Sequence, residues 1–126
     1  MATREAPIHE NVKQALINAD ELKTRLIMRT LRNTERTLHN TVVDQVLAVE
    51  NEKREKTTIE DLVPFVSGLG GKEVLEEGNM EAGILSAGQS MGFVRDIPTC
   101  QELLDRIMEQ AEGIIKDKFT QVISPA

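Results

Sequence analysis

The chain has 126 residues, of which 40% are hydrophobic and 29% are charged, and its formal net charge is −6. This size and composition predict one soluble domain with a single core, and no run approaches the roughly 18 apolar residues that a membrane span needs. The negative charge and the three Phe residues, without Trp or Tyr, argue against nucleic acid as a partner.

Residues 1–7 have no apolar run behind a basic start, so no secretory signal is expected. The single cysteine, Cys100, cannot form an intramolecular disulfide and fits a reducing compartment. A cytoplasmic location is therefore the expectation.

The first half of the sequence predicts two helices and a strand. Apolar residues recur at helical spacing over residues 8–19, with Lys13, Gln14 and Asn18 facing outward. Residues 24–30 are rich in branched side chains and predict a short strand, whose partner must be another strand of this chain or of something missing.

A second amphipathic helix is expected over residues 38–49. The charged run that follows, residues 50–56, predicts a solvated helix end and a linker.

Shorter elements are predicted next. Thr57 and Glu60 have capping-box spacing at the start of a short helix, in which Pro64 is tolerable only within the first turn. The glycines within residues 68–71 are expected to break the chain before another short helix over residues 72–77.

The last helix is the clearest element of the sequence. Thr99 has the position of its cap, with Glu102 three residues later, and charge pairs of Glu102 with Arg106 and of Glu112 with Lys116 are expected along it. Its apolar residues line one face: Leu103, Leu104, Ile107, Met108, Ala111, Ile114 and Ile115.

Four arginines form a local basic cluster: Arg25, Arg29, Arg32 and Arg36. The preferred interpretation is a solvated or ion-paired face, and the alternative is a surface that binds an anion or a neighbouring domain. The cluster alone does not decide between them.

Two ligand motifs can be considered and set aside. Residues 67–72 invite comparison with a phosphate-binding P-loop, but Val66 occupies the first glycine position and Glu73 replaces the Ser or Thr, so an ordinary glycine turn is preferred. His9 and His39 lie far apart and lack the surroundings of a metal motif, so no metal site is predicted.

Nucleophilic chemistry is also weakly supported. Cys100 lies near a helix start that would stabilise a thiolate, but no base is close in sequence, and an inert cysteine is preferred. A Ser-His-Asp arrangement built from Ser86 or Ser90 with His39 lacks the GxSxG elbow.

The best candidate for a binding surface lies in residues 83–92. Residues 83–87 predict a second short strand packed close to a neighbour, since they are small and apolar. Small residues also let a backbone approach a flat ligand, while Ser86, Gln89 and Ser90 offer hydrogen bonds. The alternative, a tight strand-to-helix turn packed on a neighbouring element, is favoured by the residue types alone.

A family resemblance shifts that balance. The run Ser86-Ala87-Gly88-Gln89, followed by Gly92, by Asp96-Ile97-Pro98-Thr99 and by the helix at Glu102-Leu103, resembles the closing segment of the nitronate monooxygenase family. Thr3, Glu5, His9 and Lys13 resemble the segment after the FMN-phosphate loop of this family, and Arg36 with Asn40 resembles its next helix. The family, once called 2-nitropropane dioxygenases, is related to flavin-dependent enoyl-acyl carrier protein reductases and NAD(P)H:quinone reductases.

The resemblance implies a (β/α)8 barrel with FMN at the carboxyl ends of its strands, which needs on the order of 250 residues. This chain would be a C-terminal piece of such an enzyme, mainly α with one or two short strands. Residues 1–80 would form a small, mainly helical domain, and residues 81–126 the barrel-closing segment and the C-terminal helix.

By the same resemblance, Ser86, Ala87, Gly88 and Gln89 would border the flavin or the substrate. No catalytic residue is assigned, because the resemblance places the catalytic histidine of the family upstream, as it does the FMN-phosphate loop. His9 matches a helix-start position of the family, and His39 matches no catalytic motif.

Two functions follow as hypotheses. The first is the C-terminal part of an FMN-dependent oxidoreductase that oxidises nitronates with O2 or reduces a quinone or enoyl substrate with NAD(P)H, inactive without the missing N-terminal barrel portion. The second is a free-standing helical module that associates with itself or another protein through the apolar stripes of residues 8–19 and 103–115.

Overall fold

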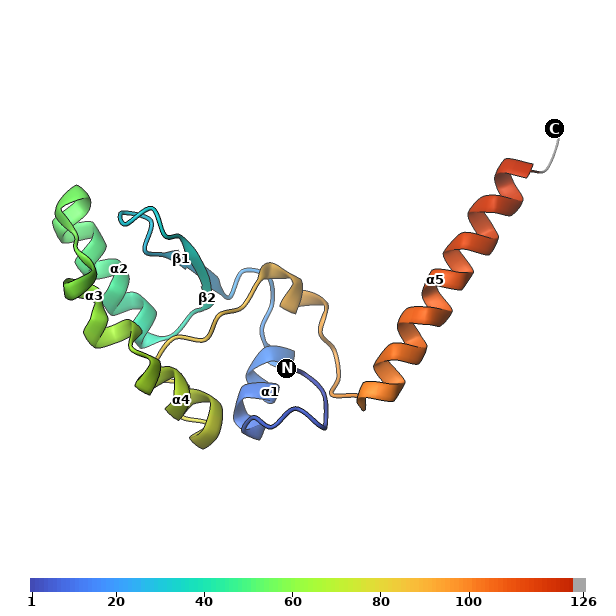
Figure 1. Ribbon diagram of the computed structural model, residues 1–126, viewed down its shortest axis with the longest axis horizontal. Helices are drawn as coiled ribbons and strands as arrows, with labels where there is room; N and C mark the ends of the chain where they lie inside the picture. Colours follow the sequence, from blue (N-terminus) through green and yellow to red (C-terminus); the bar gives the residue numbers. More distant parts are fainter. Residues whose placement is uncertain (124–126) are drawn as a thin grey trace.

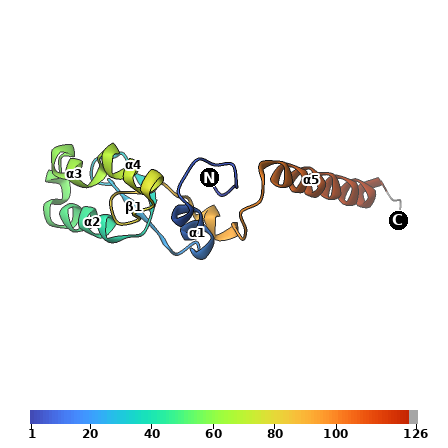
Figure 2. The same cartoon turned by 90° about the horizontal axis from the view of Figure 1, so that it is seen from below.

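A computed structural model of the chain describes residues 1–123, with the side-chain surroundings of residues 1–119. The chain is mainly helical, as the sequence predicts, and has one two-stranded sheet. The elements are α1 (Glu10–Asn18), β1 (Thr24–Ile27), β2 (Glu35–Leu38), α2 (Thr41–Lys53), η1 (Arg54–Lys56), α3 (Ile59–Val66), α4 (Gly68–Glu77), η2 (Gln89–Phe93) and α5 (Cys100–Ile123). Most of them form one body, from which α5 projects alone (Figure 1), and the view from below shows the same projection (Figure 2).

Helix α1 packs on the body through Val12 and Leu16, which lie on its predicted apolar stripe. Lys13 was expected to face outward, and this prediction is wrong, because its side chain is only 5% exposed. Its Nζ donates to the backbone carbonyl of Arg4 at 3.1 Å. The long stem of lysine lets the methylenes pack while the ammonium reaches a polar partner.

The sheet is an antiparallel pair in which Thr24 lies opposite Leu38 and Ile27 opposite Glu35. The predicted strand over residues 24–30 stops at Ile27, since Met28 has a left-handed backbone with a φ of 55°. The partner strand, β2, was not predicted. Only four residues long, it owes its extended form to hydrogen bonds with β1 rather than to a local pattern, and the helix expected from residue 38 begins at Thr41.

Asn40 caps the start of helix α2, and its side chain accepts a hydrogen bond from the amide of Val43 at 2.9 Å. The charged run after it contains the predicted solvated helix end, since α2 ends at Lys53 and residues 51–56 are all exposed. It is not a linker, because η1 follows α2 without a break. Glu50 within this run is buried. Its carboxylate accepts hydrogen bonds from the β1–β2 loop, which satisfies the charge inside the body.

The capping box of α3 lies one residue later than predicted. Thr58 is the cap, and its amide donates to the carboxylate of Asp61 at 3.0 Å. Pro64 lies beyond the first turn, contrary to expectation, and its cost is limited because the helix ends two residues later at Val66.

Helix α4 begins at Gly68, so the glycines within residues 68–71 open a helix where a break was predicted. One of them has a packing role. A Cβ at Gly70 would lie 2.4 Å from the carbonyl oxygen of Ala82, and a Cβ at Gly83 would lie 2.4 Å from the carbonyl carbon of Gly70. The two backbones therefore touch directly, which brings α4 against the chain that leads to residue 86.

Two apolar clusters hold the body together on opposite faces of the sheet. The first joins α1, α4 and the segment before and after residue 86: Val12, Leu16, Ala19, Leu38, Val74, Leu85, Ala87 and Met91. The second joins β1, α2 and α3: Ile27, Met28, Val43, Val46 and Leu62. Thr37 of β2 lies between them, fully buried, and its hydroxyl has no hydrogen-bond partner among the described residues.

Helix α5 starts with the predicted cap, in which the Thr99 amide donates to the Glu102 carboxylate at 2.7 Å. The predicted pair of Glu112 with Lys116 is confirmed at 3.0 Å. Arg106 pairs instead with Asp96, at 2.7 Å, in the segment before the helix. None of the described helices combines the length and apolarity that crossing a membrane requires.

Candidate functional site

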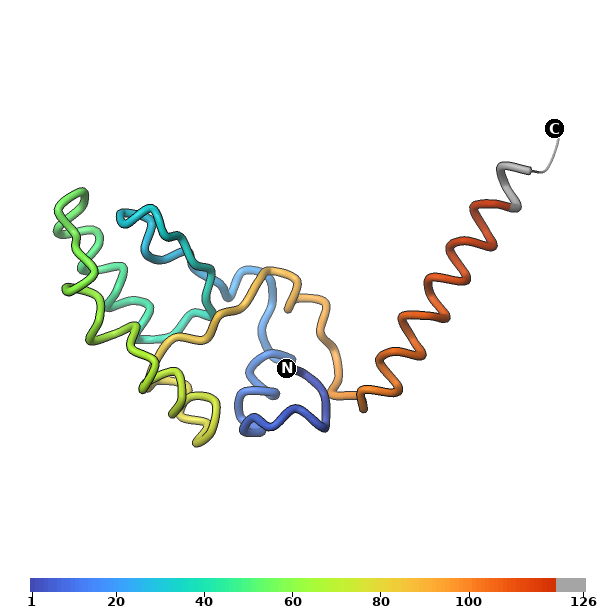
Figure 3. Tube along the Cα trace, in the orientation of Figure 1, coloured from blue at the N-terminus to red at the C-terminus, as the bar shows by residue number. Residues whose placement is uncertain are grey.

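The segment Ser86–Gln89 lies beside β2. The amide of Leu38 donates to the carbonyl of Leu85 at 2.8 Å, and the amide of Ala87 donates to the carbonyl of Arg36 at 3.1 Å. Ser86 thereby forms an isolated antiparallel bridge with Thr37, where a longer strand over residues 83–87 was expected. Figure 3 follows this trace from α4, past β2, toward the start of α5.

Side chains of the segment alternate between the core and the surface. Leu85 and Ala87 are buried in the cluster around α1, whereas Ser86, Gly88 and Gln89 are exposed. Ala87 can therefore reach a ligand only through its backbone, and the other three predicted site residues present their exposed atoms to the outside.

Ser86 has a partner that the sequence did not reveal. Its hydroxyl donates a short hydrogen bond to the carboxylate of Glu35, 51 positions earlier in the chain. No local motif marks Glu35. Glu35 reaches the site only because β2 pairs with both β1 and Ser86. Predicting its contact with Ser86 would have required the register of these strands.

Nothing within this chain requires a glycine at position 88. Its backbone is extended, with φ −80° and ψ 165°, and an added Cβ would meet only the Ser90 hydroxyl at an ordinary 3.5 Å. The space next to it is open. Gln89 and Ser90 follow in η2, exposed, and their side chains make no hydrogen bond with any described residue. Both are available to a ligand.

The approach to this segment is fixed by Asn40. Its Nδ2 donates to the carbonyls of Met80 and Gly83, each at 2.7 Å, while its Oδ1 caps α2. One amide therefore joins the start of a helix to the chain that enters the site. This residue was singled out in the sequence by resemblance alone.

A hollow of about 220 Å³ lies beside the segment, bordered by Ser86, Gly88 and Ser90 on one side and by Leu16 and Met91 at its base. Complete sites for small molecules usually enclose roughly 300–1,000 Å³. The exposed glycine and the unpaired amide and hydroxyl fit one wall of a site for a flat, polar-edged group such as a flavin. They do not make an enclosed site.

The two histidines are engaged elsewhere. His9 accepts a hydrogen bond from the amide of Asn11 at 3.1 Å and caps α1, and His39 lies 2.8 Å from the carboxylate of Asp44. Neither contacts Ser86, whose hydroxyl donates to Glu35. Across residues 1–123, no three His, Cys, Asp or Glu side chains gather as metal ligands would.

The N-terminal segment fixes the start of α5. Both carboxylate oxygens of Glu5 accept a hydrogen bond from the amide of Cys100, at 2.9 and 3.0 Å, and the amide of Arg4 donates to the carbonyl of Pro98 at 2.9 Å. The bond from the Cys100 amide holds the pKa of Glu5 below its usual value. The thiol of Cys100 is exposed and lies 3.7 Å from the hydroxyl of Thr3.

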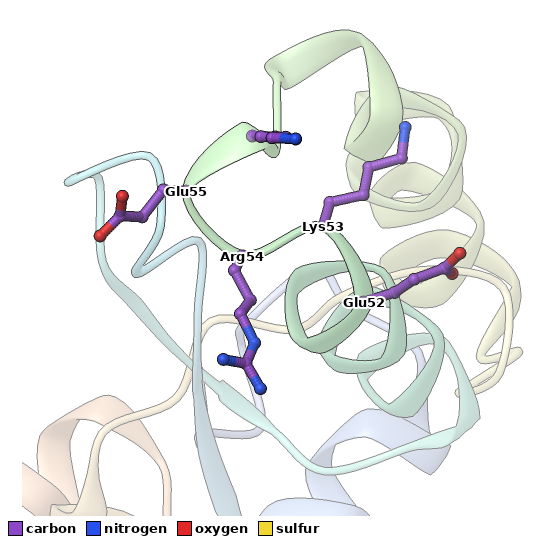
Figure 4. Close-up of a pocket in the computed structure, with 5 residues that line it drawn as sticks. Glu52, Lys53, Arg54 and Glu55 are labelled. Atoms are coloured by element: carbon purple, nitrogen blue, oxygen red, sulfur yellow. The ribbon is translucent and has the colours of Figure 1, made fainter.

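A larger hollow, about 820 Å³, lies where α2 meets η1 and is lined by residues 52–56. Its lining side chains carry both signs of charge, and the labelled ones point away from one another (Figure 4). Charges that diverge cannot converge on one ligand, so this hollow is the exposed junction of two helices rather than a candidate site.

The family model of nitronate monooxygenase matches residues 1–110. The chain belongs to the nitronate monooxygenase family. The resemblance drawn from Ser86–Gln89 and from the N-terminal residues is thereby confirmed, and the site geometry above is that of a piece of a nitronate monooxygenase family protein.

Solved structures show the same fold. FabK from Thermotoga maritima matches with a TM-score of 0.77 and 17% identity over 95% of this chain and 37% of that chain. A mutant of FabK from the same organism matches with a TM-score of 0.72 and 15% identity, over 95% of this chain and 34% of that one. This nitronate monooxygenase family chain thus spans about a third of the length of those structures.

Curated relatives match over a shorter stretch. The chain is 48% identical over 40 residues to the (3aS,4S,5R,7aS)-5-hydroxy-7a-methyl-1-oxo-octahydro-1H-indene-4-carboxyl-CoA dehydrogenase of Rhodococcus jostii, which is 32% of this chain and 11% of that protein. The dehydrogenase of the same name from Mycobacterium tuberculosis is 45% identical over 40 residues, again 11% of its length.

Proposed function

We propose that this chain is the C-terminal part of an FMN-dependent oxidoreductase built on a (β/α)8 barrel, in which Ser86–Gln89 form one wall of the flavin or substrate site. The observation that carries the proposal is the open space beside Gly88. The extended backbone of this glycine faces that space next to the free side chains of Gln89 and Ser90, in a chain of the nitronate monooxygenase family.

Each residue of the wall has a distinct role in this proposal. Gly88 allows the flat face of a ligand to approach the backbone, since no Cβ intervenes. Gln89 offers both an amide donor and a carbonyl acceptor. The hydroxyl of Ser86 donates its hydrogen bond to the carboxylate of Glu35. The Ser86 oxygen is thereby oriented so that it can accept a hydrogen bond from a ligand. The Ala87 methyl holds the wall in the core.

The flavin, when bound, would supply the redox chemistry, while this chain positions it and excludes water on one side. Substrates in keeping with the family are a nitronate oxidised with O2, or a quinone or enoyl group reduced with NAD(P)H. The names of the two curated relatives favour a substrate carried as a coenzyme A thioester.

The partner in this proposal is the upstream barrel portion. The apolar side of α5 is wide: at 100° per residue, Leu103, Ile107, Leu104 and Ile115 span about 120° of its circumference, and Phe119 extends the arc to about 160°. All are exposed. Such an arc is broader than a two-helix seam and suits a helix that lies on the surface of a larger core.

A second function is favoured by the same exposed helix. A free-standing module could cover the apolar side of α5 by association with another copy of itself, without catalysis. Sedimentation of the chain alone and in the presence of the upstream portion separates the two. A stable dimer that the upstream portion does not dissociate favours the module.

The decisive experiment is FMN titration, followed by flavin fluorescence and visible absorbance, of this chain and of a longer protein that includes the upstream barrel. Only the longer protein is expected to bind. Gly88→Val in the longer protein is expected to weaken FMN binding at least about tenfold, because the added methyl groups enter the open space at the wall.

The matched control is Gly68→Val, which adds the same atoms where nothing lies within 4 Å. Stoichiometric binding of FMN by the short chain, or full affinity of Gly88→Val, contradicts the wall assignment.

A further inference from the structure

The hairpin formed by β1, β2 and the loop between them concentrates positive charge in an acidic chain. Residues 23–36 contain five basic side chains and one acidic side chain, a net charge of +4, whereas the whole chain carries −6. The basic residues are Lys23, Arg25, Arg29, Arg32 and Arg36. Such a contrast marks a surface that attracts anions.

Only part of this charge is used within the fold. Arg25 donates to the carbonyls of Leu22 and Thr24, both at 2.9 Å, and Arg36 donates to the hydroxyl of Thr24 at 2.8 Å. Arg29 and Arg32 lie at the loop itself, exposed, and their guanidinium groups have no hydrogen bond or ion pair with any described residue. These two cations are available to a ligand.

The loop that carries them is held in one conformation. The buried carboxylate of Glu50 accepts bonds from the amide of Met28 at 2.9 Å and from the amide and hydroxyl of Thr30 at 3.1 and 2.7 Å. Met28 and Arg32 both have a φ of 55°, a left-handed conformation that residues with a side chain disfavour. A loop held against its own preference presents its arginines in a fixed arrangement.

A hollow of about 360 Å³ opens next to the loop. Leu26 and Leu47 give it an apolar floor, and Arg29, Thr30 and Asn51 give it polar sides, while the oxygens of Glu50 are occupied by the loop. This volume lies within the usual range of roughly 300–1,000 Å³ for small-molecule sites. An apolar floor beside the free guanidinium group of Arg29, with Arg32 three residues later in the same loop, fits a flat ring that carries phosphates.

We propose that this hollow, with Arg29 and Arg32, binds the phosphorylated nucleotide end of a coenzyme A thioester. The inference rests on the proposed function, because it names the substrate class of that enzyme. The adenine ring would lie on Leu26 and Leu47, and the phosphates would meet the two arginines.

The hollow and the wall lie beside different strands, since Leu26 of β1 lines the hollow whereas Ser86 of the wall pairs with Thr37 of β2. The wall borders the cluster around α1, whereas the hollow lies between the arginine loop and α2. Glu35, which holds Ser86, begins β2 directly after the arginine loop. A ligand with its nucleotide at the loop could therefore extend its thioester arm along β2 toward the wall.

Calorimetric titration of the 126-residue chain with coenzyme A, dephospho-coenzyme A and pantetheine tests this. Coenzyme A is expected to bind at low salt, dephospho-coenzyme A about three- to tenfold more weakly for the loss of one phosphate, and pantetheine not measurably. The double variant Arg29→Ala/Arg32→Ala is expected to weaken coenzyme A binding at least about tenfold.

Arg95→Ala is the matched control, because Arg95 is exposed, has no side-chain partner among the described residues and lies outside the hollow. It is expected to change the affinity by less than about twofold. Should circular dichroism show that the double variant misfolds, Asn51→Glu on the exposed side of α2 is expected to weaken binding instead, by placing a negative charge beside the phosphates.

Three results overturn the site: no binding of coenzyme A at millimolar concentration, equal losses in the arginine double variant and in Arg95→Ala, or binding of polyglutamate that coenzyme A does not displace. The last would assign the loop to an acidic protein. FMN plays no part in these titrations, so a protein that binds coenzyme A but never FMN loses the proposed function and keeps the nucleotide site.

Discussion

The helices of the body and helix α5 all carry apolar faces, but only the faces in the body are covered by other elements of this chain. In the body, Val43 and Leu62 are completely buried between α2, α3 and the sheet, whereas Leu104 and Ile107 on α5 are more than half exposed. Helix α5 projects alone from the body (Figure 1). Apolar periodicity thus predicts that a face will be buried. It does not say whether the covering surface belongs to the same chain.

The largest expected effect tests this contrast directly. Leu62→Ala is expected to lower the free energy of unfolding by about 3 kcal/mol, since it leaves a cavity in a fully buried position. Leu104→Ala removes the same atoms from a side chain that is 57% exposed and should change the free energy of unfolding by less than about 0.5 kcal/mol.

Urea unfolding of both variants provides the measurement. If Leu104→Ala costs as much as Leu62→Ala in the chain alone, α5 is covered in solution, and association of copies becomes the explanation. Repeating the pair in a protein with the upstream barrel should raise the cost of Leu104→Ala alone.

An intermediate effect is expected at Glu50, where the body depends on a buried charge rather than on apolar contact. Glu50→Gln removes at least one acceptor from the β1–β2 loop and is expected to lower the free energy of unfolding by about 1.5 kcal/mol. Amide hydrogen exchange at Met28 and Thr30 should accelerate. The exposed Glu52→Gln serves as the control, and equal effects of both would show that net charge, not the loop contacts, is responsible.

The smallest effect concerns the attachment of α5, which depends on pH. The Cys100 amide lowers the pKa of Glu5, and the Thr99 amide lowers that of Glu102. Because both values lie below the usual 4.5, their contribution is complete above pH 4.5 and is lost as the pH falls through the lowered values. Protease cleavage within residues 94–99 should accelerate in that acidic range.

Glu5→Gln should give faster cleavage at neutral pH, while Glu109→Gln, an exposed change on α5 itself, should not. Cleavage that is insensitive to pH in the native chain would mean that Glu5 does not attach α5.

Sequence reasoning found the elements that have a local pattern. The helix over residues 8–19, the strand near residue 24 and the long last helix with its cap at Thr99 all follow from spacing and capping. It failed where a distant contact decides. β2 is extended because β1 pairs with it, and Glu50 is buried because the loop before it supplies donors.

The candidate site shows the same limit. Ser86–Gln89 were found from residue types and a family resemblance, and their role at a flavin stays a prediction, as does the domain boundary after residue 80. Glu35 was missed because its contact with Ser86 exists only after the strands have paired. Lys13 was wrongly predicted to face outward, because the carbonyl of Arg4 that its ammonium reaches is not evident from the sequence.

The direct contact of Gly70 with Gly83 makes the position of the site adjustable from a distance. The two backbones meet without side chains between them, so any substitution there acts as a spacer that moves α4 away from the chain leading to Ser86. Alanine at either position would place its Cβ only 2.4 Å from a backbone atom of the other segment, so the two segments would have to move apart. Ligand geometry could thus be tuned at residues that no ligand touches.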